Sequence, residues 1–335
     1  MTQLFSHAIK GLCAGALLSV GLASAAAADK VTVNLGYAAS ETSPYAILAD
    51  KFEELVEQYT DGSVDIKVRC CTQLATEDEA FKAMQLGTVD MFIITGNNIS
   101  PHFPLTDAFV LPYIFQSKDH AYAVLDGDIG ASFSEKLLEA TGVHLLAYGF
   151  VGDRDFYNTI RKVETPADME GLKIRVPKNE VMIDTFTEFG ASPIPLAWAE
   201  TPPALQTGAI DGADNGTTFI KSQKFYEIAK HLTILEHFNY FSPLLASDRV
   251  MNKFDDAQRA AVLRAAKEAG AYHRETMNAQ IAEVRRFLGD EGGMTVTYPD
   301  KTPFIEAAKR IQDKYAEERG PEFTAFVKAV RNAAN

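Results

Sequence analysis

The chain has 335 residues, of which 47% are hydrophobic and 23% are charged, and its formal net charge is −13. This composition is that of an ordinary soluble globular protein, and the length is enough for about two domains. The strong negative charge argues against nucleic acid and anionic lipid as partners. A small anion is still compatible with it if a few arginines concentrate positive potential inside a cleft.

The first 28 residues have the features of a secretory signal peptide. Lys10 precedes an apolar stretch from Gly11 to Ala23, and a run of small residues ends at Ala28. The stretch is shorter than the ~20 residues of a membrane-spanning helix, and Cys13 inside it lacks the small preceding residue of a lipid anchor. We therefore expect a monomer in the periplasm without membrane insertion. Cleavage after Ala28 removes one lysine and no acid, so the charge becomes −14.

Two cysteines, Cys70 and Cys71, would remain after this cleavage. Adjacent Cα atoms are about 3.8 Å apart, below the usual ~4.4 Å minimum for a disulfide, and neighbouring side chains of a strand point to opposite faces. The pattern favours two partly buried thiols that pack as small hydrophobes. A strained vicinal disulfide is the alternative in an oxidising compartment.

Strand and helix patterns alternate through the first part of the mature chain. The predicted strands are Val31 to Tyr37, Val64 to Cys70 and Met91 to Thr95, and the predicted helices between them end near Tyr59 and Leu86. Helices that connect successive strands predict a mainly parallel α/β sheet, which binds ligands at the carboxyl ends of its strands. The loop from Thr95 to Asn98 lies at one such end.

The pattern then repeats, which predicts a second α/β lobe. A helix near Asp119 to Thr141 and a strand from Val143 to Phe150 lead into Gly152-Asp153-Arg154, the expected lobe boundary. Further predicted elements are strands at Leu172 to Val176 and Pro193 to Leu196, and helices at Lys178 to Phe189, Glu200 to Thr207 and Gly216 to Lys230. The segment from Ile234 to Leu245 is rich in aromatic and β-branched residues and is expected to cross back to the first lobe.

A long helix is predicted after this crossing segment. Asp255 or Asp256 caps a proline-free pattern that runs to Leu288 and stops at Gly289, which is about 50 Å at 1.5 Å per residue. A helix of this length either protrudes or lies across both lobes. The absence of a sustained heptad repeat argues against a coiled coil.

Four separated segments carry family-specific patterns. They are Glu77 to Asp90 (EDEAFKAMQLGTVD), Phe109 to Phe115 (FVLPYIF), Thr165 to Pro177 (TPADMEGLKIRVP) and Ala204 to Asn215 (ALQTGAIDGADN). In this order they resemble the substrate-binding proteins of TRAP transporters, of the DctP type. The resemblance implies an α/β, two-lobed periplasmic binding protein, type II-like, with crossing strands and a long helix spanning both lobes.

The resemblance also implies function and domain organisation. Such a protein captures a small organic anion by lobe closure and delivers it to the TRAP membrane permease subunits. Together with the patterns above, it divides the chain into a signal peptide (1–28), lobe I (29–151 plus 241–281) and lobe II (152–240 plus 282–335).

One arginine is implied to be the main ligand contact. In this family the arginine of the KIRVP-like segment holds the ligand carboxylate, and it matches Arg175. A guanidinium pairs with a carboxylate through two hydrogen bonds and stays charged when desolvated. A surface salt bridge is the alternative, although an arginine in an apolar Ile-Arg-Val-Pro run needs a partner.

Three further residues match family positions that contact the ligand. Arg154 matches a contact to the anionic or polar end, with a hinge ion pair to Asp153 or Asp155 as the alternative. Asn215 matches an asparagine that bonds the ligand beside the main arginine, although glycine here replaces the proline of the family's Glu-Asn-Pro. Trp198 matches a ring that lines the pocket, with core packing as the alternative, and the tyrosine that usually follows it is replaced by proline.

Five residues are additional candidates for ligand contacts. They are Glu41, Tyr45, Asn97, Phe219 and Tyr240. A carboxylate at Glu41 would select ligands that carry an amine or many hydroxyls. The turn-like sequence around this residue favours an exposed glutamate over a ligand contact.

No enzyme signature accompanies these residues. The chain lacks Gly-x-Ser-x-Gly, His-Glu-x-x-His and glycine-rich phosphate loops, and its mature histidines are scattered. We therefore expect a non-catalytic protein without metal or cofactor. Its ligand is expected to be a small carboxylate, with a preference for a hydroxylated monocarboxylate such as a uronate or hydroxy acid. A sensor input protein for a kinase and a periplasmic hydrolase, including a paired-carboxylate glycosidase, are the alternatives.

Overall fold

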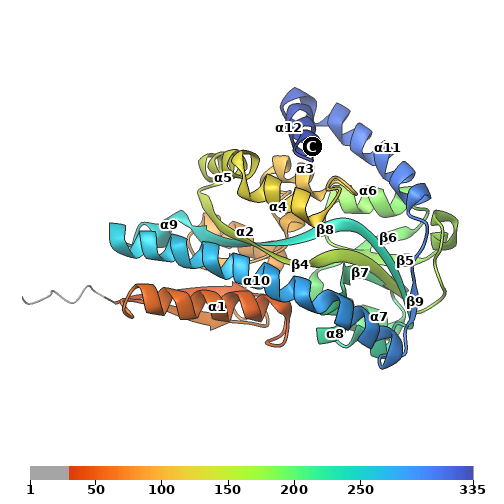
Figure 1. The fold of residues 1–335 in the computed structure, drawn as a ribbon, viewed down its shortest axis with the longest axis horizontal. Coiled ribbons are helices and arrows are strands. Elements are labelled where there is room, and N and C mark those ends of the chain that lie inside the picture. Colours follow the sequence, from red (N-terminus) through yellow and green to blue (C-terminus); the bar gives the residue numbers. More distant parts are fainter. Residues whose placement is uncertain (1–29, 335) are drawn as a thin grey trace, which may run out of the picture.

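The computed structural model describes residues 30–334, in which nine strands form one sheet with helices on both faces (Figure 1). The strands are β1 (Val31–Tyr37), β2 (Val64–Arg69), β3 (Met91–Ile93), β4 (Val143–Asn158), β5 (Lys173–Val176), β6 (Ser192–Pro195), β7 (Gly212–Gly216), β8 (His231–Ser247) and β9 (Thr295–Thr297). The predicted signal peptide lies outside the described residues. Among the described helices, none combines the length and apolar character that a membrane crossing requires.

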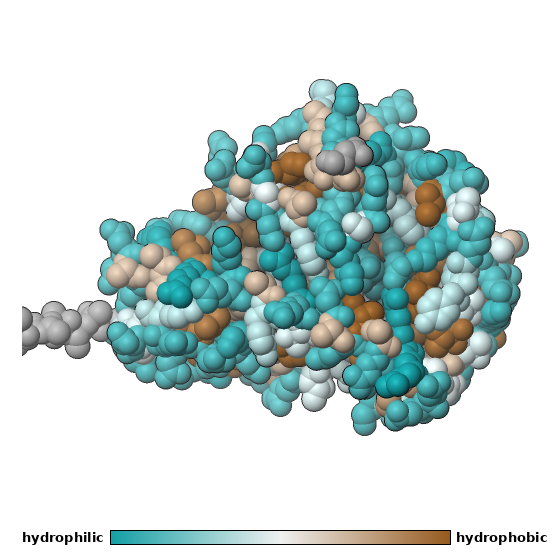
Figure 2. Space-filling model, viewed as in Figure 1, coloured by the Kyte–Doolittle hydropathy of each residue, from teal (hydrophilic) through white to brown (hydrophobic). Residues whose placement is uncertain are grey.

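The helices are those expected from the alternating pattern, with additions. They are α1 (Pro44–Tyr59), α2 (Glu77–Gln85), α3 (Asp107–Val110), α4 (Lys118–Asp126), α5 (Asp128–Thr141), α6 (Glu180–Glu188), α7 (Thr201–Thr207), α8 (Thr217–Ser222), α9 (Asp248–Met251), α10 (Asp256–Asp290), α11 (Thr302–Glu318) and α12 (Gly320–Asn332). In the view of Figure 2, hydrophilic residues cover most of the surface and hydrophobic ones form small separate patches. This surface agrees with the acidic, globular composition.

The sheet has two parallel halves joined by an antiparallel centre. Its strand order is β2-β1-β3-β8-β4-β7-β5-β6, with β9 beside β8. β1, β2 and β3 are mutually parallel and form the first half, and β5, β6 and β7 are mutually parallel and form the second half. The predicted parallel α/β arrangement is therefore confirmed within each half.

The two central strands β4 and β8 pair antiparallel over almost their whole length, from Val143↔Ser247 to Asn158↔His231. The expected crossing segment after Ile234 is confirmed as part of β8. The strand predicted to end at Phe150 instead continues to Asn158, because register shifts after Phe150 and Arg154 let the turn-like Gly152-Asp153 sequence stay in the ladder. Both strands therefore pass from the first half to the second.

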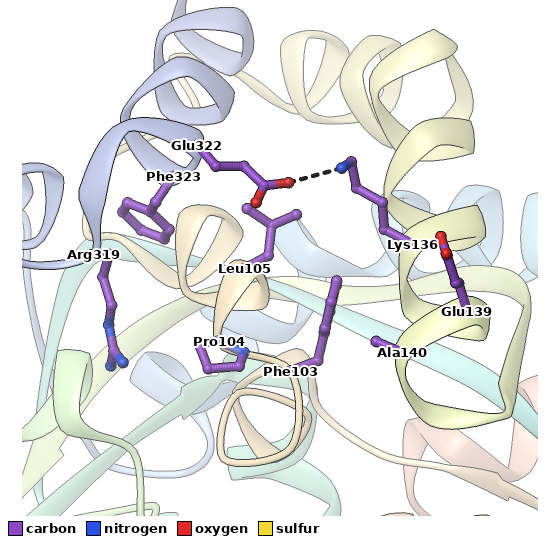
Figure 3. A pocket seen from close by; sticks show the side chains of 9 residues that line it. All are labelled: Phe103, Pro104, Leu105, Lys136, Glu139, Ala140, Arg319, Glu322 and Phe323. Atoms are coloured by element: carbon purple, nitrogen blue, oxygen red, sulfur yellow. Dashed lines mark hydrogen bonds and ion pairs between the residues drawn. The ribbon is translucent and has the colours of Figure 1, made fainter.

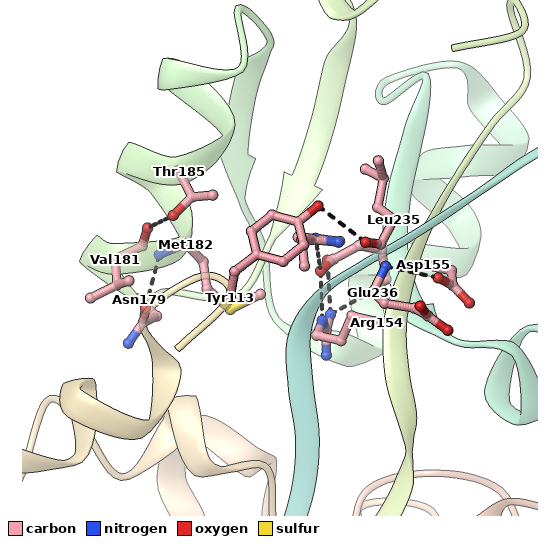
Figure 4. A network of polar contacts seen from close by, with 11 residues as sticks. Tyr113, Arg154, Asp155, Asn179, Val181, Met182, Thr185, Leu235 and Glu236 are labelled. Atoms are coloured by element: carbon pink, nitrogen blue, oxygen red, sulfur yellow. Dashed lines mark hydrogen bonds and ion pairs between the residues drawn. The ribbon is translucent and has the colours of Figure 1, made fainter. Parts of the chain in front are cut away.

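Charged side chains hold this crossing together. Asp155 on β4 and Glu236 on β8 lie side by side near Arg154 (Figure 4), and the Glu236 N–H donates to Asp155 Oδ1 at 3.1 Å. Arg285 of α10 donates to both carboxylates, at 2.9 Å and 2.8 Å. Lys301, just before α11, also pairs with Glu236. The long helix and the start of α11 are thus tied to the crossing strands.

The predicted long helix is α10, and Asp255 is its N-cap, accepting from the Gln258 N–H at 2.8 Å. It packs against α1, β4, α8 and β9, so it contacts elements of both halves and lies across the molecule (Figure 1). His273 of this helix is fully buried, accepts from the Phe150 N–H and bonds the Pro44 carbonyl. Burial lowers the pKa of His273 to about 4, so it is a neutral structural side chain.

Two predicted helices are shorter than expected. The helix expected from Asp119 to Thr141 is split into α4 and α5, because Gly127 and Gly130 let the chain turn tightly: a Cβ at these positions would lie 2.5 Å and 1.9 Å from the carbonyl oxygens of Ala123 and Leu125. The helix expected from Gly216 to Lys230 ends as α8 at Ser222, since Lys224 adopts a left-handed conformation with φ +56°.

The favoured prediction of two free thiols is wrong, since Cys70 and Cys71 form a disulfide. The argument from strand geometry fails because β2 ends at Arg69, one residue before the pair. Cys71 and Thr72 then adopt left-handed conformations, each with φ +61°. The two side chains therefore do not alternate across a strand.

Candidate functional site

The carboxyl ends of parallel strands from both halves meet at one small cavity. Ala39 follows β1, Thr95 follows β3, Arg175 lies near the end of β5 and Pro177 follows it, and Asn215 lies near the end of β7. The other lining residues are Tyr45, Glu77, Arg154, Trp198, Phe219 and Tyr240. The cavity volume is about 10 Å³, room for about one water molecule. The two halves are therefore closed on each other, and a larger ligand requires them to separate.

Seven of the nine residues proposed from the sequence line this cavity. They are Arg175, Arg154, Asn215, Trp198, Tyr45, Phe219 and Tyr240. Asn97 is buried beside the cavity, where its Nδ2 donates to the Asn98 side chain at 3.1 Å. Glu41 is exposed, and its carboxylate lies 3.6 Å from the Cys70 sulfur. That these residues bind a ligand stays a prediction.

Arg175 is a buried cation without a carboxylate partner among the described residues. Its side chain is 4% exposed, and Nε and Nη2 donate to the Leu196 carbonyl at 3.0 Å and 2.8 Å. Burial, followed by repulsion from the nearby Arg154, lowers the pKa of Arg175. A guanidinium in this position is stabilised by an anion that enters the cavity.

Arg154 is paired with Asp214, not with Asp153 or Asp155 as the alternative proposed. Its Nε and Nη2 donate to the two carboxylate oxygens at 2.6 Å and 2.8 Å, and both side chains are buried. His237 Nε2 lies 3.2 Å from Asp214 Oδ2. Burial acts to raise the pKa of Asp214, but the Arg154 guanidinium outweighs it and holds the pKa well below its usual value. Arg154 thus keeps its charge at the cavity wall.

Asn215 offers two unused polar groups. The residue is 1% exposed, and neither its Nδ2 nor its Oδ1 has a hydrogen-bond partner among the described residues. Buried polar atoms without partners are rare in native structures because each forfeits its hydration. A ligand with both donor and acceptor groups, such as a hydroxylated acid, satisfies both atoms.

Aromatic rings close the side of the cavity nearest α1 and α8. The Phe219 ring stacks on Tyr240 at 5.7 Å and meets the edges of Tyr45 and Trp198 at 5.0 Å and 5.8 Å. The Arg154 guanidinium lies 4.6 Å from the centre of the Tyr240 ring. Such rings cover the C–H faces of a ligand, and the Tyr45 and Tyr240 hydroxyls, 3.3 Å apart, add polar groups.

Glu77, which the sequence analysis did not single out, is the carboxylate that lines the cavity. It is the first residue of α2, and it accepts a hydrogen bond from Asn98 Nδ2 at 2.7 Å. Burial raises the pKa of Glu77 to about 7, against the opposing effects of the Arg175 charge and the Asn98 hydrogen bond. The cavity therefore contains two guanidiniums and one carboxylate whose charge depends on pH near neutrality.

Some site residues gave no usable signal in the sequence. An acid at the start of a helix, such as Glu77, is common because it complements the helix dipole. Asp214 and His237 lie 23 residues apart and meet only through the pairing of β4 with both β7 and β8. Thr95 could have been found, since it ends a predicted strand of the parallel sheet.

A larger cavity of about 580 Å³ lies elsewhere, between α5, α12 and the segment before α3 (Figure 3). Both of its cationic side chains already have carboxylate partners: Lys136 pairs with Glu322, and Arg319 pairs with Asp107 and Glu180. It is also not at the carboxyl ends of the strands. The small central cavity, with its unpaired buried groups, is therefore the better candidate site.

The arrangement is suited to holding an anion. Two guanidiniums can bind a carboxylate, Asn215 and Glu77 can bind hydroxyls, and the rings can cover an apolar face. No serine or cysteine with an adjacent base lines the cavity. These residues come from both halves of the sheet, so a ligand held by all of them favours the closed arrangement.

Comparisons with known proteins give a consistent result. The family model described as bacterial extracellular solute-binding protein, family 7, matches residues 35–319. The 2,3-diketo-L-gulonate-binding periplasmic protein of Escherichia coli is 31% identical over 323 residues, which cover 94% of this chain and 96% of that protein.

Solved structures of TRAP periplasmic solute-binding proteins share the fold. One from Roseobacter denitrificans with bound β-D-glucuronate has a TM-score of 0.84 and 28% identity, covering 90% of this chain and 99% of that chain. Another from the same species, with bound L-galactonate, has a TM-score of 0.83 and 31% identity over the same shares.

Proposed function

Because this chain belongs to the bacterial extracellular solute-binding proteins of family 7, the DctP family, we propose that its ligand is a hydroxylated monocarboxylate, an aldonate or uronate. The chain is the solute-binding subunit of a TRAP transporter and not an enzyme. Its family consists of extracytoplasmic periplasmic binding proteins. The hydrolase alternative is therefore wrong.

The observation that carries the proposed ligand class is that Arg175 and Asn215 line the same buried cavity. Arg175 lacks an anionic partner among residues 30–334, and both polar atoms of Asn215 are unsatisfied. A ligand whose carboxylate binds Arg175 and whose neighbouring hydroxyls bind Asn215 and Glu77 would supply the missing anion and satisfy both polar atoms of Asn215. The relatives that bind 2,3-diketo-L-gulonate, β-D-glucuronate and L-galactonate support this class.

The proposal extends to the lobes and the export of the protein. The proposed lobes are 29–151 plus 241–281 and 152–240 plus 282–335, and the register shift between Phe150 and Asp153 supports the division of the crossing strands. Residues 1–28 direct export, and the mature protein acts as a monomer. Ligand contacts from both lobes stabilise closure, and the closed protein then docks on the membrane permease pair.

A thermal-shift screen of the protein without residues 1–28 tests the ligand class. The library contains aldonates, uronates, simple dicarboxylates, amino acids and neutral sugars. At ~100 times the dissociation constant, a ligand adds ~2.7 kcal/mol of stability, and we expect an upward shift of a few degrees for sugar acids. Shifts confined to neutral sugars, amino acids or simple dicarboxylates would overturn the proposal.

The pH dependence of binding should report on Glu77. Its pKa is raised to about 7, so it is neutral below this pH and charged above it. A ligand carboxylate on Arg175 cancels part of the positive potential that favours charged Glu77, so binding is coupled to proton uptake. We expect the affinity for D-glucuronate to fall about two- to fivefold as the pH rises from 6 to 8, measured by calorimetry.

Two variants show whether this dependence comes from Glu77. Glu77→Gln should flatten the profile because the neutral amide does not titrate. Glu79→Gln changes an exposed acid in the same helical turn and should keep the slope. An unchanged slope in Glu77→Gln would assign the titration to another group.

A further inference from the structure

The Cys70–Cys71 disulfide lies next to two segments that border the candidate site, residues 38–42 and the chain from Cys71 to Asp78. We call these two segments the rim. Cys70 is 5% exposed, whereas Cys71 is exposed to solvent. Cys71 and Thr72 both have φ +61°, a region that residues other than glycine rarely adopt. The segment that leaves β2 is therefore held in a backbone conformation that the free chain disfavours.

The cysteine pair is connected to the loop that follows β1. The Cys71 N–H donates to the Ala39 carbonyl at 3.0 Å, and Ala39 lines the cavity. The next residue, Ser40, accepts a hydrogen bond from Gln223 Nε2 at 2.8 Å. Gln223 follows α8 on the second half of the sheet, so this bond joins the two sides of the cleft.

The same pair precedes the start of α2. The five residues after Cys71 lead to Glu77, which lines the cavity, and to Asp78. Asp78 pairs with Lys178, which follows β5 on the second half, at 2.8 Å. Two polar contacts across the cleft are thus carried by the two segments that flank the disulfide.

We propose that the Cys70–Cys71 disulfide is a redox-responsive support of the cleft rim. In the oxidised protein it fixes the rim of the first half in the position that contacts Gln223 and Lys178. Reduction frees Cys71 and Thr72 to leave the left-handed region, which loosens the rim and weakens closure around the ligand. The effect on affinity rests on the proposed function, whereas the effect on the rim does not.

A dithiol reductant reduces the Cys70–Cys71 disulfide in two steps. One reductant thiolate attacks the exposed Cys71 sulfur, the bond between the two cysteines breaks, and Cys70 leaves as a thiolate that takes up a proton. The second reductant thiol then attacks the mixed disulfide and releases Cys71 as a thiol. Two electrons and two protons pass to the protein, and the reductant becomes a disulfide.

Glu41 slows the first step of this reduction. Its carboxylate lies 3.6 Å from the Cys70 sulfur and opposes the negative charge that develops there. We expect Glu41→Gln to be reduced by dithiothreitol about two- to fivefold faster than the wild type. Glu57→Gln, an exposed change on α1, is the matched control and should leave the rate unchanged.

The test uses the protein without residues 1–28, which lacks Cys13. It compares the oxidised form, the form reduced with dithiothreitol, and the Cys70→Ser/Cys71→Ser variant. Mass spectrometry after iodoacetamide treatment counts thiols, hydrogen exchange without ligand follows residues 38–42 and 71–78, and calorimetry gives the D-glucuronate affinity. We expect no alkyl group before reduction and two after it. Exchange should be faster in both rim segments, and the dissociation constant should rise about three- to tenfold in the reduced and serine forms.

Either of two results would overturn the proposal. The first is two free thiols in the protein as purified, and the second is unchanged hydrogen exchange or unchanged affinity after reduction. Dithiothreitol must have no effect on the serine variant, which shows that it acts through this pair. A different result separates the two proposals. If the oxidised protein binds no sugar acid but hydrogen exchange in the rim still speeds up on reduction, the proposed ligand class is wrong and the redox-responsive rim is retained.

Discussion

Replacing Arg175 with methionine should weaken sugar-acid binding by at least about thirtyfold, because truncating one partner of a buried charge pair costs about 2–5 kcal/mol. The ligand carboxylate would then be desolvated without its two hydrogen bonds. The affinity of Arg175→Lys should lie between those of the wild type and Arg175→Met, since a single ammonium cannot reproduce the planar fork of the guanidinium. Calorimetric titration with D-glucuronate measures each affinity.

The same variant should fold at least as well as the wild type. Arg175 is buried without an anionic partner among the described residues, so methionine removes an uncompensated charge while keeping most of the volume. We expect the melting temperature of the ligand-free protein to stay equal or rise. Binding within threefold of the wild type would remove Arg175 from the site, and a large loss of stability would mean that its role is structural.

Replacing Asp214 with asparagine should have the largest effect on stability. Arg154 would remain buried with its ion pair broken, which typically costs about 3–5 kcal/mol, or about 5–8 °C in melting temperature for a chain of this size. Because pairing lowers the pKa of Asp214 from 3.8, its contribution is complete above that value and is lost as the pH falls. The difference between variant and wild type should therefore shrink below pH 4.

Two controls separate the ion pair from general damage. Glu322→Gln breaks an exposed pair with Lys136 and should leave the melting temperature almost unchanged, because solvent screens such pairs. The double variant Arg154→Met/Asp214→Leu replaces both charges and should recover much of the lost stability without recovering ligand binding. A double variant that binds as tightly as the wild type would show that Arg154 contributes only to folding.

Most residues of the candidate site could be predicted from the sequence because they lie at or near the ends of strands. Arg175 and Asn215 follow apolar or family-specific runs, and parallel strands bring their carboxyl ends to one edge. Glu77 was missed, because neither residue type nor spacing shows that the start of this helix faces the cavity. For Glu41 the sequence favoured an exposed turn glutamate over a cleft carboxylate, and it is exposed. The partner of Arg154 was also missed, since Asp214 reaches it only through strand pairing over 60 residues.

Local patterns set most of the fold, and long-range contacts explain the exceptions. The length and N-cap of α10 were predicted because capping and periodicity are local. The continuation of β4 beyond Phe150 depends on its pairing with β7 and β8, which local sequence does not show. The cysteine pair was misjudged because its bond depends on left-handed conformations at Cys71 and Thr72.

The central claim is that the cavity recognises a carboxylate with neighbouring hydroxyls, and an uncharged analogue tests it most directly. Calorimetry would compare D-glucuronate with D-glucuronamide, which has the same shape and hydroxyls but no negative charge. The two arginines predict that the amide binds at least about thirtyfold more weakly, or not at all. Equal affinities for the two compounds, or binding of neither sugar acids nor other carboxylates, would contradict the account.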